Sequence, residues 1–100
     1  MELSGWQKNK MTKKRERLEV IRDILNSVRE KRKIKPTRLL YSSNLSPQMF
    51  KTYVDELLTK GFIQIEMDKK EKKFFILSKK GSEFLQEYVV IQNFVENFGL

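Results

Sequence analysis

The fold is decided by residues 36–61, which read PTRLLYSSNLSPQMFKTYVDELLTKG. Pro36 suits the first turn of a helix, where its missing N–H costs nothing, and the polar residues 42–44 break that helix. Ser46 then offers an N-cap hydroxyl, and Pro47 suits the first position of a second helix. Gly61 is a favoured residue just beyond a helix end. The segment therefore predicts a short helix, a tight turn and a longer helix.

Regular apolar patterns flank this segment. Four apolar residues before it recur at helical steps and predict an amphipathic helix: Leu18, Ile21, Leu25 and Val28. After it, two runs of β-forming residues on either side of a charged tip predict a hairpin. Ser78 then caps a last helix. The expected helices cover about residues 15–31, 37–43, 47–60 and 79–98, and the expected strands cover residues 62–67 and 74–77. The predicted fold class is α+β, mostly α.

The net charge and the missing residue types narrow the function. Lysine and arginine number 21 against 13 aspartates and glutamates, and the net charge of +8 favours nucleic acid or another polyanion as partner. The chain has no cysteine and no histidine, which removes disulfides, thiolate zinc sites and the commonest general base. No apolar run reaches the roughly 20 residues of a membrane span, and no secretory signal is recognisable. We expect a non-enzymatic intracellular protein without a cofactor, a metal, a membrane anchor or a small-molecule substrate.

The predicted order of elements is that of a winged helix-turn-helix. In that fold the longer helix enters the major groove of DNA, and the basic hairpin, or wing, lies along the phosphate backbone. Solvated surfaces also carry such residues, and lysines on a hairpin prevent edge-to-edge aggregation, but the combination favours DNA. The candidate DNA-binding residues are Lys8, Lys10, Lys13, Lys14 and Arg15 near the N-terminus, Thr37 and Arg38 in the short helix, Ser46, Gln48, Lys51 and Thr52 around the longer helix, and Lys69, Lys70, Lys72 and Lys73 at the hairpin tip. Lys60 is a weaker candidate for a phosphate contact.

The last predicted helix carries an apolar stripe with heptad spacing. Its members are Phe84, Tyr88, Ile91, Val95 and Phe98. Steps of four, three, four and three residues are typical of the seam of a coiled coil. The helix could also pack on its own domain, but the core looks complete without it. We therefore expect it to form a homodimer interface.

Several stretches resemble an archaeal winged-helix family typified by the Sulfolobus ten-kilodalton class a chromatin protein. They are residues 34–38, 40–41, 44–46, 53–63, 75–81, 84–85, 88 and 98–100. The resemblance covers about residues 18–100, although residues 29–33 are all charged where the family usually carries a glycine turn. It implies a homodimer joined by an antiparallel coiled coil of the last helices. It also implies binding of double-stranded DNA with little sequence preference, in chromatin organisation or regulation.

The sequence thus predicts a DNA-binding protein in three parts. Residues 1–14 form a basic flexible arm, residues 15–78 a winged helix-turn-helix domain, and residues 79–100 a dimerisation helix. The arm supplies five positive charges up to Arg15 against one negative charge. The expected location is cytoplasmic and chromosome-associated. Two alternatives stay open: a sequence-specific transcriptional regulator, and a winged-helix scaffold that binds an acidic protein instead of DNA.

Overall fold

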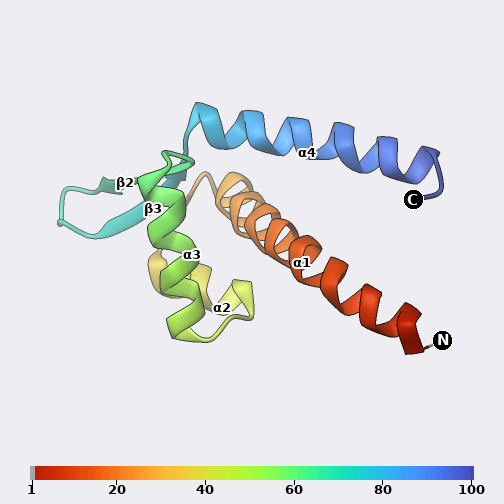
Figure 1. The fold of residues 1–100 in the computed structure, drawn as a ribbon. Coiled ribbons are helices and arrows are strands. Elements are labelled where there is room, and N and C mark those ends of the chain that lie inside the picture. The colour runs from red at the N-terminus through yellow and green to blue at the C-terminus, as the bar shows by residue number, and fades with distance from the viewer. Residues whose placement is uncertain (1) are drawn as a thin grey trace.

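The computed structural model describes the backbone of residues 2–100 and the side chains of residues 17–100. Its elements, in chain order, are α1 (Glu2–Lys31), β1 (Lys33–Ile34), α2 (Pro36–Ser43), α3 (Pro47–Thr59), β2 (Ile63–Met67), β3 (Lys73–Leu77) and α4 (Lys79–Asn97). The helices α2 and α3 and the β2–β3 hairpin lie at one end of the molecule (Figure 1). The helices α1 and α4 diverge toward the other end, where both chain termini lie. The fold is therefore a mostly helical winged helix.

The predicted helix–turn–helix segment is confirmed almost residue for residue. α2 begins at Pro36 and ends at Ser43, and Asn44 adopts a left-handed conformation with φ of 58°. Ser46 caps α3, because its hydroxyl oxygen accepts a hydrogen bond of 3.2 Å from the Met49 N–H. Gly61 has φ of 78°, a conformation that favours glycine, and it directs the chain from α3 into β2.

Two features before α2 differ from the prediction. The backbone of α1 is already helical at Glu2, upstream of the expected start near Arg15, because the apolar pattern that marked the helix begins only at Leu18. The structure also contains β1, which pairs antiparallel with β3 and was not expected. Arg32, with φ of 64°, reverses the chain between α1 and this strand. A strand of two residues is too short to show alternation in the sequence.

The sheet has the strand order β1–β3–β2, so β2 is an edge strand of the wing. Ile63 lies opposite Leu77, Ile65 opposite Phe75, and Met67 opposite Lys73. Residues directly opposite each other in an antiparallel pair point to the same face. Ile63, Phe75 and Ile34 are buried on the face that contacts the helices. We call this face the helix-side face of the sheet.

The core lies where α1, α2, α3 and the sheet meet. Its buried residues are Ile21, Ile24, Leu25, Val28, Ile34, Leu39, Phe50, Val54, Leu57, Ile63, Phe75 and Leu85. Leu85 belongs to α4, so the expectation that the core is complete without the last helix is wrong. Phe84 packs edge-on against Phe62, with ring centroids 5.5 Å apart. The first turns of α4 are therefore part of the domain.

The start of α4 approaches β2 very closely. Ser78 caps the helix by accepting a hydrogen bond of 3.0 Å from the Gly81 N–H. A Cβ atom on Gly81 would lie 2.3 Å from the carbonyl oxygen of Phe62 and 2.7 Å from a methyl carbon of Leu77. Only glycine, which has no Cβ atom, fits this position without a clash.

In the part of the chain that the structure describes, no helix has the length and apolar character needed to cross a membrane.

Candidate nucleic-acid interface

The outer face of α3 carries the residues predicted to face DNA, and all four are exposed: Ser46, Gln48, Lys51 and Thr52. The hydroxyl of Thr52 donates a hydrogen bond of 3.1 Å to the backbone oxygen of Gln48. Lys51 forms an ion pair of 2.7 Å with Asp55, one helical turn further on. Both groups of this pair are well exposed, so the pair is weak and Lys51 stays free to exchange partners. The side-chain amide of Gln48 forms no hydrogen bond within residues 17–100.

α2 presents a polar edge beside α3. Thr37 and Arg38 are exposed, as predicted. Tyr41 is 80% exposed and lies three residues after Arg38, so the two side chains share one face of the helix. Tyr41 was not among the predicted DNA-binding residues, although its place on the polar side of a short helix was a usable signal.

The tip of the wing is a defined turn built around Asp68. One carboxylate oxygen of Asp68 accepts hydrogen bonds from the backbone N–H groups of Lys70 and Lys72, at 2.8 and 2.9 Å. These contacts, the N–H of Lys72 first, hold the pKa of Asp68 below its ordinary value. Glu71 adopts a left-handed conformation with φ of 63° within the turn.

The charge of the wing tip is mainly unneutralised. The four predicted lysines are all exposed: Lys69, Lys70, Lys72 and Lys73. None of these four lysines forms an ion pair with another side chain of residues 17–100. Asp68 directs its carboxylate at the backbone of the turn instead of at a lysine ammonium. The unexpected strand β1 adds Lys33, whose ammonium lies 4.9 Å from the ring centroid of Phe74 on the opposite face of the wing.

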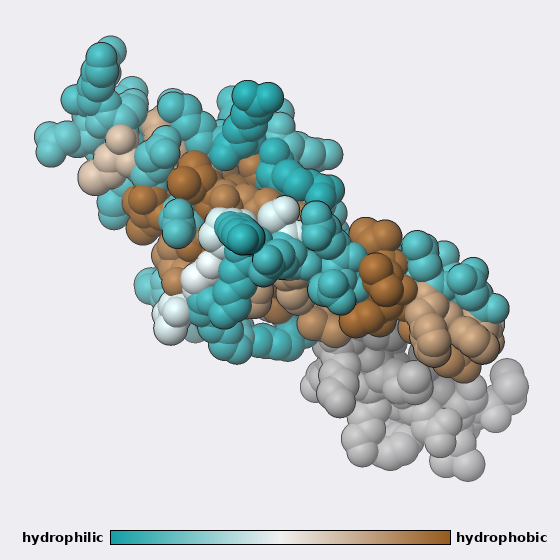
Figure 2. Space-filling view, turned by 90° about the horizontal axis from the view of Figure 1, so that it is seen from above, coloured by the Kyte–Doolittle hydropathy of each residue, from teal (hydrophilic) through white to brown (hydrophobic). Residues whose placement is uncertain are grey.

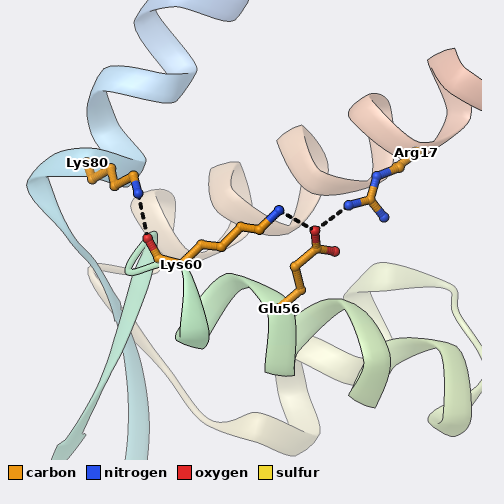
Figure 3. A network of polar contacts seen from close by, with 4 residues as sticks. All are labelled: Arg17, Glu56, Lys60 and Lys80. Atoms are coloured by element: carbon orange, nitrogen blue, oxygen red, sulfur yellow. Dashed lines mark hydrogen bonds and ion pairs between the residues drawn. The ribbon is translucent and has the colours of Figure 1, made fainter.

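A network of polar contacts links α3 to α1 and α4 (Figure 3). The carboxylate of Glu56 on α3 accepts hydrogen bonds from Arg17 of α1 and, at 2.9 Å, from Lys60. The ammonium of Lys80 on α4 donates to the backbone oxygen of Lys60, at 2.8 Å. Lys60 first, and then Arg17, lowers the pKa of Glu56. We call these four residues the brace; it links α1, α3 and α4 and occupies Lys60, which the sequence suggested for a phosphate contact.

The predicted dimer residues divide into two groups along α4. Phe84 and Tyr88 are half-buried against their own domain, and the guanidinium of Arg22 lies 5.2 Å from the ring centroid of Tyr88. Val95 is half-buried, whereas Ile91 is 61% and Phe98 68% exposed. Other apolar residues of the last helix and the chain end are also exposed: Val89, Val90, Phe94 and Leu100. Figure 2 shows brown and tan side chains gathered at this end of the molecule.

The predicted arm contacts fall outside the described side chains. Lys8, Lys10, Lys13, Lys14 and Arg15 belong to the first 16 residues, of which only the backbone of α1 is described. Their contacts with DNA stay a prediction.

Among the described residues, no group of three acidic, histidine or cysteine side chains is placed to hold a metal ion.

The geometry and the sequence agree on the class of protein. Residues 14–96 match the family model of the winged helix-turn-helix, and the chain belongs to this family. An uncharacterized protein of the archaeon Methanocaldococcus jannaschii is 40% identical over 70 residues, which cover 70% of this chain and 66% of that protein. The chain therefore spans slightly less than two thirds of that relative.

Two solved structures show the same fold. Sso10a-2, a DNA-binding protein from Sulfolobus solfataricus, superposes with a TM-score of 0.66 at 22% identity, over 81% of this chain and 82% of its own. A MarR family transcriptional regulator from Silicibacter pomeroyi has a TM-score of 0.68 at 18% identity, over 98% of this chain and 70% of its own. The family match over residues 14–96, the archaeal relative and the shared fold of Sso10a-2 together confirm the resemblance.

Proposed function

We propose that this protein binds double-stranded DNA as a homodimer, mainly through the phosphates and with low sequence specificity. The observation that carries the proposal is the basic wing, which lies at the same end of the molecule as α3 and has no acidic partner for its lysines among residues 17–100. In this arrangement α3 enters the major groove and the wing lies along the adjacent backbone. Sso10a-2, which shares this fold, is a DNA-binding protein, and this supports DNA binding by the chain.

The polar side chains of α3 favour low specificity. Reading bases requires donors and acceptors that are free to face base edges. The hydroxyl of Thr52 is directed to the backbone of its own helix, and Ser46 is engaged as the N-cap. Gln48 is then the main candidate to contact a base, whereas phosphate contacts from the wing carry no sequence information. A chromosome-associated, cytoplasmic role in organising DNA follows from this reading.

The exposed end of α4 favours a second copy of the chain as partner. Phe94 and Phe98 stack with ring centroids 4.8 Å apart and yet remain largely exposed. On the same helix, a groove of about 220 Å³ is lined by apolar residues, Leu18 of α1 and Tyr88, Ile91 and Val95 of α4, together with Glu19, Gln92 and Glu96. Exposed apolar side chains that gather in this way are typical of an interaction site. Pairing of two α4 helices in antiparallel orientation covers it and links two DNA-binding units, which raises affinity through avidity.

DNA binding is tested by fluorescence anisotropy of two unrelated labelled duplexes across a salt series. We expect similar affinities for both and a steep salt dependence, with a slope of about 0.9 for each phosphate contact. The double variant Lys70→Ala/Lys72→Ala should lower that slope by up to about 1.8 for each protomer that contacts the duplex. The control Asn93→Asp/Asn97→Asp removes the same net charge at the other end of the molecule and should leave the slope nearly unchanged.

The same titration separates the alternatives. A strong preference for one duplex contradicts low sequence specificity and favours a sequence-specific regulator; the MarR family neighbour is a transcriptional regulator by name. No binding to either duplex at low salt contradicts DNA binding and favours a scaffold for an acidic protein.

The dimer is tested separately by light scattering. Ile91→Glu places a charge in the exposed apolar surface of α4 and should convert the dimer to a monomer. Gln86→Glu, an equally exposed position on the same helix, is the matched control and should stay dimeric. An unchanged mass for Ile91→Glu would contradict pairing through α4.

A further inference from the structure

The wing carries two apolar side chains, Ile65 and Met67, that its own domain covers only by about half. On β2, every second residue points to the helix-side face: Ile63, Ile65 and Met67. Ile63 is buried in the core, but Ile65 is 46% and Met67 54% exposed. Apolar residues on an isolated hairpin gain nothing from exposure to water. Their position therefore points to a function outside the domain.

These two side chains face the same side as the helices. Ile65 lies opposite Phe75, which is buried against the helices, and Met67 lies opposite Lys73. The hairpin extends beyond α2 and α3, so its helix-side face continues past the core into open space (Figure 1). We expect a duplex that rests on α3 to meet this face of the wing.

The charges around Met67 match the flanks of a DNA groove. Met67 is the last residue of β2, directly before the turn that holds Lys69, Lys70 and Lys72. A minor groove is bordered by two phosphate backbones, and lysines around the tip can contact both while the apolar residues face the groove floor. Apolar side chains such as methionine and isoleucine are used in this way to separate stacked base pairs and to kink the duplex.

On the basis of the DNA binding proposed above, we infer that the wing enters the minor groove and that Met67, supported by Ile65, inserts between adjacent base pairs and bends the DNA. The unstacking it requires is easiest at TA and CA steps, because pyrimidine–purine steps are readily kinked. The protein would thus prefer flexible steps without reading bases through hydrogen bonds. Phosphate contacts by the wing lysines offset the energy of unstacking.

The inference is tested with a short duplex that carries a fluorophore pair at its ends and 2-aminopurine beside a single TA step. Anisotropy reports binding, energy transfer reports bending, and 2-aminopurine fluorescence reports unstacking. The variants are Met67→Gln, which keeps the length of the side chain, and Ile65→Thr, which keeps β-branching. Gln64→Ser, on the opposite face of the same strand, is the matched control. All are exposed positions, and circular dichroism verifies that each variant is folded.

For the wild-type protein we expect a bend of roughly 20–90° and an increase in 2-aminopurine fluorescence. Met67→Gln/Ile65→Thr should abolish both signals while its affinity changes by less than about tenfold, because the lysine contacts remain. Gln64→Ser should behave as the wild type. Binding without a bend, or a bend that survives the double variant, would overturn the inference and leave DNA binding intact. If the wild-type protein binds no duplex at low salt, the proposed function fails and the inference fails with it.

Discussion

Replacing Gly81 by alanine tests how tightly α4 is joined to the wing. The added Cβ atom would lie 2.3 Å from the carbonyl oxygen of Phe62, and backbone atoms cannot yield as a flexible side chain can. That oxygen also accepts hydrogen bonds from the N–H and the hydroxyl of Ser78, at 3.1 and 2.9 Å. Relief of the clash therefore requires α4 to move away and these hydrogen bonds to lengthen.

The expected loss of stability follows from three contributions. Overpacking costs about 1–3 kcal/mol, and weakening a hydrogen bond adds about 1 kcal/mol. The higher helix propensity of alanine offsets about 1 kcal/mol of this loss of stability. The net destabilisation is about 1–3 kcal/mol, which lowers the Tm of a domain of this size by at least about 4 °C.

Thermal unfolding followed by circular dichroism, at one fixed protein concentration, measures the effect. Ser82→Ala, the next position in the same helical turn, adds no atom and serves as the control. A Tm for Gly81→Ala equal to or above that of the wild type would refute the reasoning, because it would mean that α4 is not held against Phe62.

Three further predictions concern the core, the brace and the wing. Leu57→Ala opens a cavity at a fully buried position and should lower the free energy of unfolding by about 2–5 kcal/mol in urea titration, whereas Leu100→Ala at the exposed chain end should change it by less than about 0.5 kcal/mol. Glu56→Gln should be less stable than the wild type by up to about 1 kcal/mol at neutral pH. Because the pKa of Glu56 is lowered from 4.5, this stabilisation is present above that value and should disappear as the pH falls through the lowered pKa; a gap that persists in acid would contradict it. Asp68→Ala removes the acceptor of the wing turn and should speed hydrogen exchange at the N–H groups of Lys70 and Lys72, and unchanged protection would show that Asp68 does not hold the turn.

The part of the fold that could be predicted is the part with local signals. Prolines at helix starts and the serine caps at Ser46 and Ser78 act within one turn, so sequence alone located α2, α3 and the start of α4. β1 depends on pairing with β3, more than forty residues later, and a strand of two residues leaves no pattern. Leu85 was missed as a core residue for the same reason, because only the packing of α4 on the sheet buries it.

The sequence predicted which residues form the candidate site, but not which of them form ion pairs with other side chains. The exposure of the wing lysines agrees with the sequence analysis, since charged residues at a hairpin tip are rarely buried. Lys51 and Lys60 each have a carboxylate four residues away on α3, a spacing that favours ion pairs and that the sequence displayed. Arg17 could not be assigned to Glu56 in this way, because that contact joins two helices far apart in the chain.

The brace links the length of α4 to the geometry of the proposed dimer. In the proposed dimer, where α3 and the start of α4 are tied to the same residues, the paired α4 helices would set the distance and the rotation between the two copies of α3. Each residue inserted in α4 adds 1.5 Å and turns the remainder of the helix by about 100°. A natural change in the length of this helix would therefore change which two turns of a duplex one dimer can contact, without any substitution in the DNA-binding surface of the protein.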